Sequence, residues 1–176
     1  VVDADIVARE IVEKGQPALR QIHAAFGDWV LLDNGELNRR ALREHIFKDP
    51  NTRKVLESIT HPAIRQSIIQ QLQAATSPYV ILVSPLLFET NQHELTDHSL
   101  LIDATEELQI QRASQRDGQS IEQIQKIIQA QMPRQKKRSL ADDIVLNDGH
   151  LDHLYSHLKP LHNAYLQRSK QKKAVD

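Results

Sequence analysis

The sequence contains no cysteine, which excludes disulfides, metal sites built on thiolates and a thiol nucleophile. No apolar run approaches the ~20 residues that a membrane-spanning helix needs. Residues 1–5 carry charge where a signal peptide would have an apolar stretch. The Gly-x-Ser-x-Gly pattern of many serine hydrolases is also absent. We therefore expect a cytoplasmic protein without a membrane partner.

Net charge is nearly absent as well, because 22 Lys and Arg oppose 23 Asp and Glu. This balance argues against general binding of nucleic acid. The charge is nevertheless uneven, since residues 112–138 hold seven basic and two acidic side chains. A solvated helix face is the ordinary explanation of such a block. The alternative is a site for a small anionic ligand.

Four short apolar runs predict buried strands, and their lack of polar alternation is typical of a parallel sheet. They are residues 1–2, 79–83, 100–102 and 144–146. Amphipathic stretches between them predict helices. These cover residues 16–26, 38–47, 51–75 with a break at 61–62, 105–116, 120–132, a short basic helix after 133, and the chain from 152 onward. At 176 residues the sequence predicts one α/β domain.

Two carboxylates, Asp3 and Asp5, follow the first predicted strand. Ligands of open parallel sheets bind at the carboxyl ends of the strands, so Asp5 is placed to orient or deprotonate a hydroxyl. Helix capping is the alternative, because Asp is a favoured capping residue. After the second strand, residues 84–89 combine a proline turn, an apolar wall and the carboxylate of Glu89.

Basic side chains recur in the second half of the chain. Arg112 and Arg116 are four residues apart and share a helix face, and more cations follow Pro133. A mobile basic flap of this kind neutralises charge in phosphoryl transfer, although exposed arginine pairs are common. Residues 147–149 are a turn that could also hold a purine. Three histidines from 150 to 157 lack the chelating partners of a metal site, and the sequence leaves metal binding undecided.

Taken in order, these motifs resemble the dephospho-coenzyme A kinase family. The resemblance extends from residue 1 to about residue 167, and its motifs are short but follow one another in the family's order. The matching segments are Val2-Asp3-Ala4-Asp5 with Ala8-Arg9, Gly35-Glu36-Leu37-Asn38-Arg39 with Leu42 and Ile46-Phe47, His61-Pro62 with Ile64-Arg65, Pro85-Leu86-Leu87-Phe88-Glu89, Ile102-Asp103-Ala104 with Gln109, Arg112 and Arg116-Asp117, and Gln131, Ala141-Asp142, Asn147 and Gly149.

The resemblance implies a P-loop kinase-like three-layer fold with a parallel sheet, a helical substrate region and a lid. The core would comprise residues 1–14, 77–111 and 139–176, the substrate region about 15–76 and the lid about 112–138. The implied reaction is ATP-dependent phosphorylation of the ribose 3′-hydroxyl of dephospho-CoA, giving CoA and ADP in the last step of coenzyme A biosynthesis. ATP and Mg²⁺ are the implied cofactors, and a monomer or weak homo-oligomer is expected.

The family pattern also implies roles for individual residues. Asp5 would face the ribose hydroxyl as the candidate base. The dephospho-CoA side would be lined by Asp3, Arg9, Arg39, His61, Leu87, Phe88 and Glu89. ATP and the lid would involve Arg112, Arg116, Arg134, Lys137, Arg138, Asn147 and Gly149.

Two departures from the family pattern affect this interpretation. The strand, the phosphate-binding P-loop and the helix that precede Asp-Ala-Asp in the family, roughly thirty residues as such units go, do not appear, and no Gly-x-x-x-x-Gly-Lys-Ser/Thr occurs anywhere. The chain as given is therefore expected to be inactive. The lid arginine of the family falls on Lys137, which lacks the planar fork of arginine, and Arg134 or Arg138 would have to compensate. A related small-molecule kinase and a non-catalytic domain that binds a coenzyme A precursor remain the alternatives.

Overall fold

The computed structural model of the chain describes residues 1–173, so the end of the predicted core segment 139–176 lies outside the described part. The chain forms two compact units. One comprises Val1–Thr76 with Val80–Ser84, and the other comprises Ser77–Tyr79 with the chain from Pro85 onward. Within the described residues, no helix is both long and apolar enough to cross a membrane.

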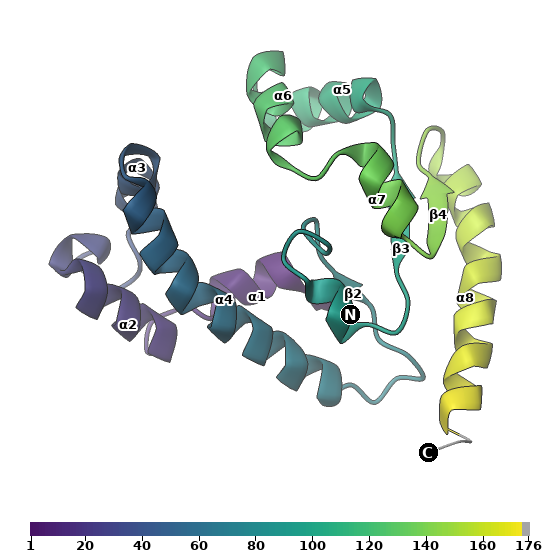
Figure 1. The fold of residues 1–176 in the computed structure, drawn as a ribbon, viewed down its shortest axis with the longest axis horizontal. Coiled ribbons are helices and arrows are strands. Elements are labelled where there is room, and N and C mark those ends of the chain that lie inside the picture. Colours follow the sequence, from purple (N-terminus) through teal and green to yellow (C-terminus); the bar gives the residue numbers. More distant parts are fainter. Residues whose placement is uncertain (174–176) are drawn as a thin grey trace. The chain divides into compact units, whose positions relative to one another are not determined.

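The first unit combines a two-stranded parallel sheet with helices. Strand β1 (Val2–Asp3) pairs with β2 (Leu82–Val83), with Val2 opposite Leu82. Between them lie α1 (Ala4–Glu10), α2 (Pro17–Phe26), the 3₁₀ turn η1 (Asp28–Val30), α3 (Arg39–Lys48) and α4 (Pro50–Gln73). The long helix α4 contacts α1, α2 and α3, as Figure 1 shows. The most deeply buried side chains of this unit are Val7, Ile22, Val30 and Ile68.

The helix ends of this unit follow the predicted signals. Pro17 occupies the first turn of α2, and Gly27 ends the helix at a φ of 86°, a conformation that favours glycine. Asn38 caps α3 by accepting a hydrogen bond of 3.1 Å from the Ala41 amide. Both predicted helices are therefore confirmed to within one or two residues.

The predicted break at His61 and Pro62 is wrong, because α4 continues through both residues. Proline removes one backbone hydrogen bond from a helix and crowds the preceding turn, but packing can outweigh that cost. Here α4 contacts three other helices of its unit, and Ile68, six residues after Pro62, is fully buried. His61 therefore lies on a helix rather than in a loop.

The second unit contains the other strand pair. It consists of the 3₁₀ turn η2 (Gln92–Leu95), β3 (Leu100–Asp103), α5 (Glu106–Asp117), α6 (Ile121–Ala130), α7 (Arg134–Leu140), β4 (Asp143–Leu146) and α8 (Leu151–Lys173). Strands β3 and β4 are parallel, and Leu100 pairs with Asp143 while Asp103 pairs with Leu146. Helix α7 contacts β3 and α8 contacts β4.

All four predicted strands form, and both pairs are parallel, which confirms the predicted α/β class. Their predicted burial on both faces is only partly correct. Val2 and Val145 are buried, whereas Val83, Ile102 and Leu146 keep about 44–45% of their surface exposed. Each unit described here has a sheet of two strands, and so narrow a sheet leaves apolar side chains at its margins.

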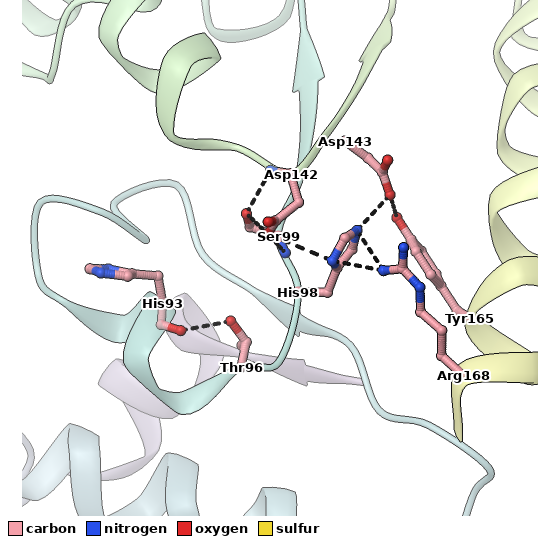
Figure 2. A network of polar contacts seen from close by, with 8 residues as sticks. All are labelled: His93, Thr96, His98, Ser99, Asp142, Asp143, Tyr165 and Arg168. Atoms are coloured by element: carbon pink, nitrogen blue, oxygen red, sulfur yellow. Dashed lines mark hydrogen bonds and ion pairs between the residues drawn. The ribbon is translucent and has the colours of Figure 1, made fainter. Parts of the chain in front are cut away.

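A network of hydrogen bonds connects α8 to the amino ends of β3 and β4 (Figure 2). The Asp143 carboxylate accepts hydrogen bonds from the Tyr165 hydroxyl (2.8 Å) and from His98 Nε2 (2.7 Å). Arg168 Nη1 lies 2.8 Å from Nδ1 of the same ring and 3.0 Å from its Nε2.

A second contact in the same network joins the two segments that precede the strands. Ser99 donates to Asp142 from both its amide (2.8 Å) and its hydroxyl (2.7 Å). These hydrogen bonds lower the pKa of Asp142, and the Tyr165 hydroxyl and His98 lower that of Asp143. The polar groups at this end of the sheet thus satisfy one another.

Candidate active site

At the carboxyl end of β3, one buried carboxylate holds two arginines. Asp103 is 3% exposed and accepts two hydrogen bonds of 2.7 Å from Nε and Nη2 of Arg134. Arg138 donates to the same carboxylate through Nη1. The hydrogen bonds of Arg134, followed by those of Arg138, hold the pKa of Asp103 below its ordinary value. Asp103 is therefore a charged hydrogen-bond acceptor for both guanidinium groups.

The sequence around α7 explains this arrangement. Pro133 precedes the helix and leaves Arg134 at its first position. Arg138 follows four residues later, so both side chains lie on one helix face. Because α7 packs against β3, this face meets the strand end that carries Asp103. The two arginine side chains remain about one third exposed.

A second ion pair joins α7 to the turn before η2. Lys137 Nζ lies 3.1 Å from Glu89 Oε1, which also accepts a 2.9 Å hydrogen bond from the Met132 amide. Burial alone would raise the pKa of Glu89, but the Met132 amide and Lys137 outweigh it and lower that pKa. Lys137 also donates to the Gln131 side chain at 3.3 Å. Lys137 therefore supports the turn that contains Glu89.

The loop after β4 is held by α5. Arg112 Nη1 donates a 2.6 Å hydrogen bond to the backbone carbonyl of Asn147. Arg116, on the same helix, makes two hydrogen bonds of 2.7 Å to the neighbouring Asp117. The two arginines of α5 thus have different partners, and only Arg112 reaches the strand ends. Gly149 is exposed in the same loop.

In the first unit, the structure shows which of Asp3 and Asp5 is the helix cap. Asp3 caps α1, and its Oδ1 accepts from the amides of Asp5 (2.8 Å) and Ile6 (3.2 Å). Asp5 lies in the first turn of α1 with an exposed side chain. Capping therefore belongs to Asp3, and the carboxylate of Asp5 is accessible at the carboxyl end of β1.

The remaining predicted acceptor residues are distributed over both units. Arg9 and Arg39 are exposed neighbours, and Arg39 Nη2 lies 3.5 Å from the Arg9 carbonyl oxygen. His61 is exposed on α4. In the second unit Leu87 and Phe88 are half-buried, and the Phe88 ring lies 5.5 Å from that of His93.

The structure brings together three pairs that the sequence had proposed separately. They are Arg134 with Arg138, Lys137 with Glu89, and Arg112 with Asn147. It does not bring Arg116 to any of these pairs. The sequence places Asp103 in a matching motif without indicating a role for it. The rule that selected Asp5, an acid at the end of a predicted parallel strand, would have selected Asp103 as well.

No group of three or more His, Asp or Glu side chains within residues 1–173 is placed to hold a metal ion. Both oxygens of Asp103 already accept hydrogen bonds from arginine. These residues do not form a magnesium site by themselves.

Comparison with known proteins identifies the family. A family model described as dephospho-CoA kinase matches residues 1–153 of the chain. The chain belongs to the dephospho-CoA kinase family. Membership of this family associates the chain with kinase chemistry and with the final step of coenzyme A biosynthesis.

Individual members of the dephospho-CoA kinase family are closely similar in sequence. The dephospho-CoA kinase of Acinetobacter baylyi is 75% identical over 166 residues, which are 94% of this chain and 85% of that protein. The dephospho-CoA kinase of Hahella chejuensis is 49% identical over 166 residues, which are 94% of this chain and 80% of that protein.

Solved structures agree with the assignment to the dephospho-CoA kinase family. A crystal structure from Thermus thermophilus has a TM-score of 0.76 and 31% identity, and the match covers 93% of this chain and 83% of that one. A dephospho-CoA kinase from Campylobacter jejuni has a TM-score of 0.68 and 27% identity, with 95% and 85% coverage. These likenesses support the P-loop kinase-like fold predicted from the sequence.

Proposed function

We propose that the protein transfers the γ-phosphate of ATP to the ribose 3′-hydroxyl of dephospho-CoA, giving CoA and ADP. The observation that carries the proposal is the convergence of Arg134 and Arg138 at the carboxyl end of β3, in a chain of the dephospho-CoA kinase family. Ligands of parallel sheets bind at that end, and phosphoryl transfer requires cations around the transferred group. Both substrates would be small molecules.

In the proposed reaction, the 3′-oxygen forms a bond to the γ-phosphorus while the bond from that phosphorus to the β–γ bridging oxygen breaks. ADP leaves with the electron pair of that bond, and the hydroxyl proton passes to Asp5 or to solvent. We expect Asp5 mainly to orient the hydroxyl, because a loose transition state leaves the protein little covalent chemistry to perform. Its accessible position at the end of β1 supports this role.

The other predicted residues have supporting roles in this proposal. Arg9, Arg39 and His61 would contact dephospho-CoA from exposed positions, with Asp3 fixing the helix that carries Asp5. The turn that contains Leu87, Phe88 and Glu89 would line the acceptor side, supported by Lys137. Arg112 would hold the loop of Asn147 and Gly149 beside the adenine.

We propose that Mg²⁺ accompanies ATP through its phosphate oxygens, since magnesium in kinases is commonly bound by substrate phosphates and few carboxylates. We also infer that turnover requires a phosphate-binding loop that is not among these 176 residues, because none of them forms Gly-x-x-x-x-Gly-Lys-Ser/Thr. The related small-molecule kinase and the non-catalytic binding domain are the competing functions. We also propose that the protein acts in the cytoplasm as a monomer or weak homo-oligomer.

The testing experiment measures ADP formation from ATP and Mg²⁺ with and without dephospho-CoA. It uses the protein at its natural length and, in parallel, the 176 residues alone. Acceptor-dependent ADP formation by the natural-length protein is expected, together with binding but no turnover by the 176 residues. Equal rates with nucleosides or other alcohols as acceptors would contradict the choice of substrate. Dephospho-CoA binding without ADP formation by either protein would favour the non-catalytic function.

Asp5 is tested in the same assay. Asp5→Asn keeps the shape of the side chain and removes its charge, so we expect kcat to fall by about 100-fold or more while the KM for dephospho-CoA changes little. Asp33→Asn, a substitution of the same kind at an exposed loop position of the same unit, is the control. An unchanged kcat for Asp5→Asn would remove Asp5 from the mechanism.

A further inference from the structure

The carboxylate of Asp103 has an unusual position for a group with no assigned role. It is 3% exposed, and its two oxygens accept hydrogen bonds from three donor nitrogens, two on Arg134 and one on Arg138. A buried carboxylate is costly unless it is paired and hydrogen-bonded. Here the pairing is complete, and the lowered pKa keeps the group ionised at neutral pH.

Stability alone is a weak reason for such a cluster. A buried ion pair often contributes little compared with apolar side chains of similar size, because desolvation offsets the attraction between the charges. The ion pairs also fix the orientation of polar groups, which apolar packing cannot do. One carboxylate fixes the orientation of two planar guanidinium groups that belong to successive turns of α7.

Both guanidinium groups keep donors for another ligand. Arginine has five N–H donors, and Arg134 directs two of them at Asp103 in a side-by-side pair. The side chains of Arg134 and Arg138 are 33% and 32% exposed. Glu106 and Glu107, in the first turn of α5, also act on the charge of Arg134, so what the cluster offers at the carboxyl end of β3 is oriented guanidinium donors rather than a surplus of positive charge.

We propose that Asp103 is a positioning residue, which holds Arg134 and Arg138 in the orientation that binds the phosphate groups of ATP. The inference rests on the proposed function, since it takes ATP as the anionic ligand. The proposal gives neighbouring residues of α7 different roles. Arg134 and Arg138 bind phosphate, whereas Lys137 is engaged by Glu89 and supports the turn before η2.

The competing explanation is that Asp103 only anchors α7 to β3. The two explanations differ in what a substitution changes. Loss of an anchor lowers the melting temperature and affects both substrates alike. Loss of a positioning group affects ATP selectively, because misplaced binding groups lose transition-state and substrate contacts even in a folded protein.

The experiment compares Asp103→Asn, Asp103→Glu and the control Asp97→Asn in the natural-length protein. Asp97 belongs to the same unit, pairs with Lys172 at 2.7 Å and is 82% exposed, so the control removes the same charge elsewhere. For Asp103→Asn we expect the KM for ATP to rise by about tenfold, with the KM for dephospho-CoA within about twofold of the original. Asp103→Glu keeps the charge and should recover part of the loss. Asp97→Asn should change neither constant.

Unchanged KM for ATP and unchanged kcat in folded Asp103→Asn would overturn the inference, as would equal losses for both substrates. If circular dichroism shows that Asp103→Asn is unfolded, Asp103→Glu is measured in its place. Unchanged KM for ATP and unchanged kcat in that variant, or equal losses for both substrates, would then overturn the inference. Calorimetric titration of ATP separates this result from the proposed function. Weaker ATP binding by the variant supports the positioning role even if dephospho-CoA proves not to be the acceptor. Absence of ATP binding by the unmodified protein contradicts both.

Discussion

At the carboxyl end of β3, Arg134 and Arg138 share the carboxylate of Asp103, and their side chains remain about one third exposed. At the amino ends of β3 and β4, Asp142 and Asp143 face His98 with one arginine, and hydroxyl groups complete the contacts. Both clusters are built from carboxylates and basic side chains, but basic groups outnumber the carboxylate that they contact only in the first.

Two criteria distinguish the proposed ligand-binding cluster at the carboxyl ends from the structural network at the amino ends. The first is the ratio of side chains in direct contact, since two arginines contact one carboxylate at the carboxyl end, whereas two carboxylates face one arginine and His98 at the amino end. The second is hydrogen-bond capacity, since the amino-end network links α8 to the segments that precede the strands through groups that satisfy one another (Figure 2). The presence of an ion pair alone therefore does not identify a ligand-binding site. Unused donors at the carboxyl end of a parallel sheet are the additional feature of the proposed site.

The largest effect is expected from a substitution that breaks the cluster of Asp103, Arg134 and Arg138. Arg134→Gln removes a cation and its planar fork, and we expect kcat/KM for ATP to fall by about 100-fold because charge on the transferred phosphate loses its partner. Steady-state kinetics of the natural-length protein measure it. Arg168→Gln, the equivalent change in the amino-end network, is the matched control and should stay within about twofold. Equal losses in the two variants would abolish the distinction between the clusters.

A smaller effect is expected at the amino end. Asp143→Ala leaves the Tyr165 hydroxyl and His98 without their shared acceptor, and we expect the free energy of unfolding to fall by about 1–3 kcal/mol. Urea denaturation measures this change, and kcat/KM in the folded range should remain within about twofold. A loss of activity with unchanged stability would show that this network belongs to the active site.

The smallest effect concerns Tyr165, whose pKa is raised by burial and by the neighbouring Asp143. A raised pKa means that the contribution of the hydroxyl to stability is present below the ordinary tyrosine pKa of about 10 and is lost as the pH rises above it. Tyr165→Phe should therefore cost about 1 kcal/mol at pH 8 and less at higher pH.

Melting temperatures between pH 8 and 11 test the behaviour of Tyr165. The control is Tyr155→Phe on the same helix, where the side chain is 60% exposed. A difference between Tyr165→Phe and the unmodified protein that stays constant across this range would refute the assigned coupling to Asp143.

The sequence predicted the elements more fully than their contacts. Strand positions, the Asn38 cap and the glycine end of α2 follow from local chemistry, which a single sequence displays. The continuity of α4 through Pro62 depends on packing against three other helices, which no local signal contains. Asp5 and the cations of α7 were predicted as site residues, and their roles remain proposals.

The pairing of those cations could not be predicted. Choosing between Arg134, Lys137 and Arg138 requires knowing which carboxylate each one meets, and those carboxylates lie 31 to 48 residues earlier in the chain. Glu89 engages Lys137, and Asp103 engages the two arginines. The apolar runs likewise predicted strands correctly but not the partial exposure of Ile102, because exposure depends on how many strands lie side by side.

Hydrogen exchange measured by mass spectrometry, with and without ATP and dephospho-CoA, tests the contrast between the two ends most directly. We predict slower exchange in segments 103–112 and 131–140 when ATP is bound, with little change at 97–99 and 142–143. Protection centred on 97–99 and 142–143, with 103–112 and 131–140 unchanged, would contradict the assignment of the carboxyl ends of β3 and β4 as the nucleotide-binding site.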